Sequence, residues 1–207
     1  MTAKLAVVVC AVLLVGESVH SQAGQTARGV RLEIQSGSKA EYRVREQLAR
    51  LNFPNDAVGA TESITGALVV RPDGTFTGDS RLTVDMRTLR TDEPKRDGFV
   101  RKNTLETNRY PLAEFVPRRH TGLPTPLPTS GGATFKLIGD FTLHGVTAEQ
   151  TWDVAATFAG DAVNAKATTR FNFAKYRITI PRIFGLLSVD DDIRLELNVR
   201  MRRVAAP

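Results

Sequence analysis

The sequence predicts an all-β protein, an antiparallel β-barrel of about eight strands with one or two short helices. Three observations favour this fold. Apolar and polar residues alternate with a period of two over long segments, short turns join these segments, and each segment has one apolar and one charged face. Amphipathic strands with little helix must close into a barrel or stack as two sheets, and long consecutive hairpins favour the barrel.

The C-terminal half carries the clearest alternation. Strands are predicted at residues 134–143, 146–158, 163–173 and 193–202. The pairs His144-Gly145 and Gly160-Asp161 provide tight turns between the first three of them. Consecutive strands joined by tight turns pair as antiparallel hairpins, so this half predicts a continuous meander.

The N-terminal half shows the same pattern with more interruptions. Strands are predicted at residues 42–48, 63–71, 80–86 and 112–118, with a short additional strand at 31–35. A helix is predicted from Glu93 to Leu105, with Asp92 as its N-cap and Pro94 in its first turn. The Pro- and Gly-rich segment 121–132 is interpreted as a surface loop rather than an interdomain linker, because strands continue on both sides. Residues 174–189 are irregular and apolar enough to lie over an opening.

Residues 1–21 are predicted to be a secretory signal peptide. Lys4 precedes a short apolar run that ends at Gly16, and small and polar residues follow. Small residues favour cleavage before Gln22 or before Gly24, and an uncleaved anchor is the alternative. The run also holds Cys10, the only cysteine of the sequence. A mature chain without cysteine suits an oxidising compartment, so we expect a periplasmic protein.

The chain is basic, with a net charge of +6 and an isoelectric point near 9.8. Cleavage leaves the charge unchanged, because it removes both Lys4 and Glu17. Export argues against nucleic acid as a partner. The charge therefore favours contact with an anionic membrane surface or an acidic ligand head, and simple solubility is the alternative. The densest charge clusters, Arg96-Asp97 and Asp190-Asp191-Asp192, are interpreted as a helix-surface ion pair and a turn before the last strand.

The apolar strand faces are predicted to lie inside the barrel, since an outer-membrane barrel has the reverse arrangement. Small inward residues such as Gly66, Ala113 and Gly139 leave room that either a packed core or a ligand uses. An eight-stranded barrel is just wide enough to hold one small ligand. The residues predicted to line such a cavity are Leu82, Val84, Phe115, Phe135, Leu137, Phe141, Trp152, Val154, Phe158, Phe171, Phe173, Leu195 and Leu197. The aromatic members have a second interpretation as plain core.

The sequence predicts no catalytic residue, no metal site and no cofactor. After cleavage only His120 and His144 remain, and neither has a metal ligand at the usual spacing on its own strand. No nucleophile elbow or phosphate-binding Gly-rich loop occurs. At its predicted hairpin, His144 either contacts a ligand head group or bonds the backbone of the turn. Glu46 is an inward-facing acid, so it is the candidate base if the protein is an enzyme acting on a lipid.

Several motifs in order resemble the YceI-like family of bacterial periplasmic proteins. They are Asp85-Met-Arg-Thr-Leu-Arg-Thr91, Lys95-Arg-Asp-Gly-Phe99, Tyr110-Pro-Leu-Ala-Glu-Phe115, Leu143-His-Gly-Val-Thr147 and the ending Leu187 to Glu196. The likeness covers residues 29–203, and it implies a single lipocalin-like barrel domain with an elongated apolar cavity. Many members have a histidine in the first strand where this chain has Glu46, so no role of that histidine carries over.

The resemblance implies a binding or carrier protein for a polyisoprenoid or another long-chain lipid, with no enzymatic activity. Some members of the family pair as dimers, so a homodimer is a further expectation. Two alternatives stay open at this point: a structural or partner-binding barrel without a ligand, and a lipid-modifying enzyme. A cavity filled by its own side chains would favour the first alternative, and a perturbed acid deep in the cavity would favour the second.

Overall fold

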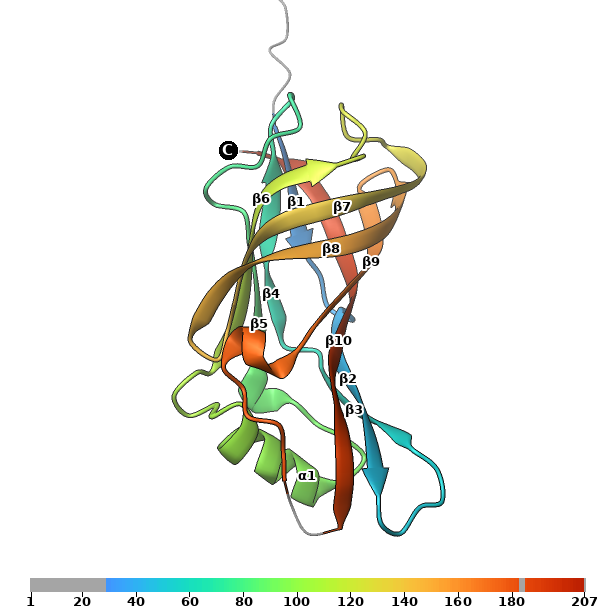
Figure 1. Cartoon of the computed structure of the whole chain (residues 1–207). Helices are drawn as coiled ribbons and strands as arrows, with labels where there is room; N and C mark the ends of the chain where they lie inside the picture. The colour runs from blue at the N-terminus through green and yellow to red at the C-terminus, as the bar shows by residue number, and fades with distance from the viewer. Residues whose placement is uncertain (1–28, 183–184, 207) are drawn as a thin grey trace, which may run out of the picture.

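The computed structural model describes residues 29–182 and 185–206, so the predicted signal peptide lies outside the described residues (Figure 1). Strands dominate the described chain. They are β1 (Val30–Ile34), β2 (Lys39–Leu48), β3 (Asn55–Thr61), β4 (Ile64–Val70), β5 (Arg81–Asp85), β6 (Leu112–Thr121), β7 (Ser130–Leu143), β8 (Val146–Ala159), β9 (Ala162–Phe171) and β10 (Leu186–Ala205). The helical elements are short: η1 (Met86–Thr88), α1 (Pro94–Phe99), η2 (Val100–Thr104) and η3 (Phe173–Tyr176).

Eight strands close into an antiparallel barrel, as predicted. Their order is β1-β4-β5-β6-β7-β8-β9-β10, and pairing of β1 with β10 completes the ring. The 20-residue strand β10 changes partner along its length. Its first part, Leu186–Asn198, pairs with β2, and its last part, Met201–Ala205, pairs with β1.

A buried serine holds β10 where it changes partner. Ser38 is 1% exposed and lies between β1 and β2. Its hydroxyl accepts a hydrogen bond from the Arg200 amide at 3.0 Å and donates to the Gln35 carbonyl at 2.8 Å. The side chain thus satisfies a backbone donor that the strand ladder leaves free at this point.

The β2–β3 hairpin extends the wall beyond the closed ring. β3 pairs with β2 over its whole length, and its other side forms one bridge, Ala60 to Arg90, within the described part of the chain. In Figure 1 this hairpin and the lower part of β10 project toward the end of the molecule where α1 lies. The barrel therefore has a closed half next to β1 and a second half bounded by β2, β3 and α1.

The structure corrects the sequence predictions of these elements at several places. Strand β3 was not predicted, because Asn55–Thr61 is short and rich in alanine and glycine, so its alternation is weak. The helix cap is Glu93, whose carboxylate accepts from the Lys95 amide at 3.2 Å, whereas Asp92 forms an ion pair with Arg96. The segment 190–192 is not a turn: it lies within β10, where the register with β2 shifts between Val189 and Ile193.

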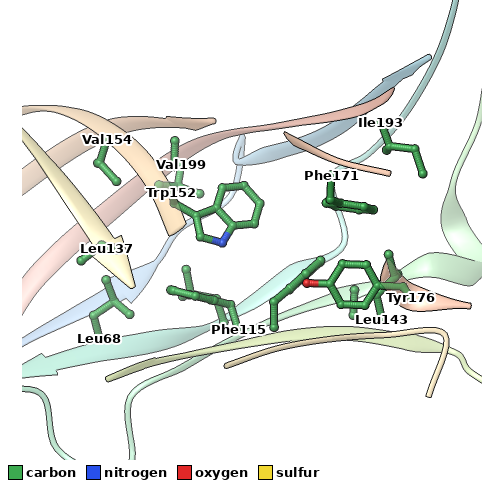
Figure 2. Close-up of a cluster of buried hydrophobic side chains, with 14 of the residues drawn as sticks. Leu68, Phe115, Leu137, Leu143, Trp152, Val154, Phe171, Tyr176, Ile193 and Val199 are labelled. Carbon is green, nitrogen blue, oxygen red and sulfur yellow. The ribbon is translucent and has the colours of Figure 1, made fainter. Parts of the chain in front are cut away.

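A continuous cluster of buried side chains fills the closed half of the barrel and extends into the walls of the other half. Trp152 lies at its centre in Figure 2, with Val154, Leu137 and Val199 to one side and Phe171 to the other. The Trp152 ring meets the rings of Phe115 and Phe141 edge-on, with centroids 5.9 and 5.8 Å apart. Among the described residues, no helix is both long and apolar enough to cross a membrane.

Candidate functional site

A cavity of about 780 Å³ occupies the half of the barrel next to α1. This volume lies in the range typical of small-molecule sites. Strands from all sides of the barrel line it, together with α1, η2 and the segment before β10. Most of the lining side chains are apolar, so the cavity suits a ligand that is itself largely apolar.

The predicted lining residues divide between the two halves of the barrel. Nine of the thirteen line the cavity: Leu82, Val84, Phe115, Phe141, Trp152, Phe171, Phe173, Leu195 and Leu197. The other four, Phe135, Leu137, Val154 and Phe158, do not line it and belong to or pack against the core of the closed half. Pairing of β1 with β10 closes the ring there, and side chains fill the space. Alternation predicts which side chains point inward, but not how far along the barrel each one lies.

Three further segments contribute to the walls. The helical region supplies Phe99, Val100 and Leu105. The irregular segment before β10 supplies Ile178 and Pro181, consistent with its predicted place over an opening. The hairpin residues Ala40, Val44, Leu48 and Ala57 also line the cavity and were absent from the predicted set. The even-numbered positions of β2 alternate as clearly as those of later strands, so this signal could have found them.

The exposed lining residues mark the mouth of the cavity. Ala49 and Arg50 follow β2, Lys95 lies on α1, and Gly185 precedes β10; all four are exposed and line the cavity. The Ala49 amide donates to the Gly185 carbonyl at 2.9 Å, which holds two sides of the mouth together. The cavity therefore opens at the end of the barrel where α1 lies, opposite the closed half.

One largely buried ion pair lies in the mainly apolar wall. Glu46, 8% exposed, accepts from Arg96 on α1 at 2.9 Å and from the side-chain amide of Asn55 at 3.3 Å. Arg96 also pairs with Asp92. The predicted Arg96–Asp97 pair is wrong, because buried Asp97 instead accepts from the Thr91 amide at 2.7 Å. Two carboxylates thus fix α1, one through β2 and one through the chain that leads into the helix.

Tyr42, Val44 and Glu46 alternate along β2 and lie on the same face of the strand. The Tyr42 ring covers Gly59, its partner in the β2–β3 register, where a Cβ atom would come within 2.2 Å of the ring. Burial raises the pKa of the Tyr42 hydroxyl to about 12, and nearby Arg96 acts in the opposite direction. The phenol therefore stays neutral at physiological pH and contributes an uncharged surface to the wall.

His144 lies outside the cavity lining. It occupies the β7–β8 turn with a positive φ of 52°, and its Nδ1 lies 3.2 Å from the Tyr176 carbonyl oxygen. Its ring packs edge-on against Tyr110 at a centroid distance of 4.8 Å. Of its two predicted roles, the geometry fits contact with the backbone of a neighbouring loop. Among the described residues, no three His, Cys, Asp or Glu side chains gather in positions to hold a metal ion.

The sequence of this barrel matches a known protein family. Residues 34–201 match the model of the YceI-like domain. The chain belongs to the YceI-like family. A UPF0312 protein of Pseudomonas putida strain W619 is 32% identical over 141 residues, which are 60% of this chain and 68% of that protein. A UPF0312 protein of Pseudomonas syringae pv. tomato is 35% identical over 98 residues, covering 43% of this chain and 46% of that protein.

Solved structures share the fold of this YceI-like domain. A polyisoprenoid binding domain from Saccharophagus degradans, implicated in plant cell wall breakdown, aligns with a TM-score of 0.62 at 11% identity, covering 86% of this chain and 100% of that chain. Burkholderia cenocepacia BcnA aligns with a TM-score of 0.58 at 15% identity, covering 79% and 95%. The YCEI protein of Campylobacter jejuni gives 0.57 at 15% identity, covering 78% and 91%. At these identities the likeness establishes the common fold of the YceI-like domain.

Proposed function

We propose that this YceI-like protein is a periplasmic binding or carrier protein that holds one long-chain apolar lipid, of the polyisoprenoid type, in the barrel cavity. The observation that carries the proposal is the apolar cavity of about 780 Å³ with a mouth at one end. The likeness to a polyisoprenoid binding domain supports the ligand class. The predicted signal peptide supports the compartment, because its sequence pattern is typical of exported proteins.

The apolar wall provides enough free energy for tight binding. Each buried methylene contributes about 0.8 kcal/mol, so a chain of about fifteen carbons contributes roughly 12 kcal/mol before ordering and association costs. These costs are several kcal/mol or more, which leaves a net affinity useful to a carrier. A long-chain lipid is almost insoluble in water, and enclosing it in the barrel removes its apolar surface from solvent.

Two features argue against the alternatives. A purely structural barrel would fill its interior with side chains, as the closed half does, whereas the half next to α1 encloses the cavity. An enzyme acting on the lipid would need a free acid or base at the cavity, and the Glu46 carboxylate is engaged by Arg96 and Asn55. The proposal therefore includes no covalent chemistry.

Native mass spectrometry of the protein purified gently from the periplasm tests this function. We expect a mature chain that begins at Gln22 or Gly24, with an added mass that organic solvent extracts and that fragments as a long-chain lipid. The extracted protein should rebind such lipids with a change in the fluorescence of Trp152, the only tryptophan of the sequence and a cavity residue. A chain without added mass that stays unchanged after incubation with a mixed lipid extract would refute the carrier function.

A cavity-filling variant makes the test specific to this site. Ala57 and Ala113 line the cavity, and replacing both with phenylalanine should lower lipid occupancy while the barrel stays folded. The matched control is Ala156→Phe, since Ala156 is buried in the closed half, away from the cavity. Overpacking there should destabilise the fold by about 1–3 kcal/mol. Equal lipid occupancy in the wild type and the Ala57/Ala113 double variant would contradict the assignment of the cavity.

A further inference from the structure

We propose that the mouth of the cavity docks directly onto an anionic lipid surface. In this arrangement Leu51, Phe53 and Leu187 insert among the lipid headgroups, while Arg50 and Lys95 meet the lipid phosphates. The inference rests on the proposed carrier function and adds to it the route by which a lipid enters and leaves the barrel.

Exposed apolar side chains gather at the mouth. Phe53 is 79% exposed, Leu187 is 66% exposed and Leu51 is 40% exposed, and these are three of the four large hydrophobic residues exposed in the described chain. Phe53 and Leu51 belong to the β2–β3 loop, and Leu187 is the second residue of β10. Pairing of Leu48 with Leu186 holds the loop and this strand end side by side. In Figure 1 they form the lower tip of the molecule, together with α1.

Basic side chains stand beside these apolar residues. Arg50 and Lys95 are exposed lining residues of the mouth, and neither forms an ion pair within the described structure. Two carboxylates lie nearby: exposed Asp92 pairs with Arg96, and Glu93 caps α1 through the Lys95 amide and keeps its negative charge. Arg50 and Lys95 thus place two basic side chains without an ion-pair partner in the described structure next to exposed apolar groups, in a chain with a net charge of +6. This combination matches an anionic lipid surface.

The position of the apolar residues favours a membrane over a protein partner. A stable protein interface needs a broad complementary patch, whereas these side chains project from a loop and a strand end around an opening. Shallow insertion of a few such side chains gives weak, reversible binding, which suits a carrier. With the mouth against the bilayer, an apolar ligand passes from the membrane into the cavity without crossing water.

Vesicle flotation tests the docking surface. The mature protein is mixed with phosphatidylcholine vesicles that contain increasing fractions of phosphatidylglycerol. Binding should rise with the anionic fraction and fall with added salt, because salt screens exposed charges. The variant Arg50→Glu/Lys95→Glu should bind at least about 25-fold more weakly, at about fivefold for each basic residue lost near an anionic surface. The variant Phe53→Ser/Leu187→Ser should lose about tenfold at every anionic fraction.

Matched controls change the same residue types at positions that do not line the cavity. Leu112 is 40% exposed at the start of β6, and Arg202 is exposed near the end of β10, about 50 Å along the strand from Leu187. Leu112→Ser and Arg202→Glu should each bind vesicles within about twofold of the wild type. Circular dichroism of every variant shows whether the barrel is folded.

Three outcomes overturn the docking surface. The first is that the wild type binds neutral and anionic vesicles equally, or binds neither. The second is that the control variants lose as much vesicle binding as the mouth variants do. The third is a concentration-dependent dimer that Phe53→Ser/Leu187→Ser abolishes, which would assign the apolar residues to a second copy of the chain. Native mass spectrometry separates this inference from the carrier function. A wild type that carries lipid, beside Phe53→Ser/Leu187→Ser variants that neither bind vesicles nor gain lipid from them, supports both. A lipid-free wild type that still binds anionic vesicles through the mouth refutes only the carrier.

Discussion

Removing the Glu46 carboxylate should destabilise the barrel at the place where α1 is fixed to β2. The side chains of Glu46 and Arg96 are 10% and 18% exposed, so their ion pair is largely shielded from water. Breaking a fully buried pair costs about 3–5 kcal/mol, and exposed pairs contribute about 0–1 kcal/mol. Arg96 keeps its contact with exposed Asp92, so we expect Glu46→Ala to lower the free energy of unfolding by about 2–3 kcal/mol. For a domain of this size, the midpoint of thermal unfolding should then fall by roughly 5–10 °C.

Urea unfolding of lipid-extracted protein, followed by Trp152 fluorescence, measures this loss without the stability that a bound ligand adds. The control is Glu149→Ala, which removes an acid from the exposed pair with Arg119 and should change stability much less. In the double variant Glu46→Ala/Arg96→Met, part of the loss should return, because no unpaired charge then remains in the wall. If Glu46→Ala costs no more than Glu149→Ala, or if Arg96→Met restores nothing, the pair does not fix α1 as argued.

Three other changes test the packing around the site. Burial holds the pKa of Tyr42 near 12, above its ordinary value of 10. The stability that the neutral phenol contributes is therefore complete below pH 10 and is lost as the pH rises toward 12, so the free energy of unfolding of the wild type should fall by roughly 1 kcal/mol more than that of Tyr42→Phe between pH 9 and 11, as urea unfolding measures. Gly139→Ala should lower the free energy of unfolding by more than about 3 kcal/mol in thermal unfolding, since its Cβ would lie 2.2 Å from a β6 backbone oxygen. Gly132→Ala on the same strand meets only a 3.6 Å contact, so it should be nearly neutral. Tyr176→Phe should cost about 1 kcal/mol by the same measurement, because it removes the 3.2 Å hydrogen bond to Gln150 while Lys175 keeps that acceptor satisfied.

The strands that the sequence predicts best are those whose pairing is local. β7, β8 and β9 follow one another through tight turns, so alternation and turn residues define both the strands and their partners. Strand β3 was missed because Ala57, Gly59 and Ala60 are small, and their contrast with the polar positions is weak. Gly59 is small for a reason that only the three-dimensional structure reveals: the Tyr42 ring lies over it.

The extent of the cavity could not be predicted from local patterns. Phe141 and Phe135 occupy equivalent inward positions on β7, yet only Phe141 lines the cavity. The difference depends on where β10 exchanges β2 for β1, a pairing between segments about 160 residues apart in the sequence. The roles of Glu46 and Arg96 also depend on such a long-range contact. From the sequence alone, Glu46 was therefore a candidate base and not the ion-pair partner of an arginine on α1.

The change of partner along β10 explains why one barrel has both a packed half and a cavity. Where β1 completes the ring, inward side chains from opposite walls meet and fill the interior. Beyond Ser38 the neighbour of β10 becomes β2, the β2–β3 hairpin departs from the ring, and α1 with η2 bounds the other side of the space. A helix does not fill this width as a paired strand would, so the cavity and its mouth arise from the same feature of topology. The exposed loop and strand end that this arrangement creates are the segments that carry Phe53 and Leu187. The geometry that encloses an apolar ligand therefore also presents the apolar rim through which we expect that ligand to enter.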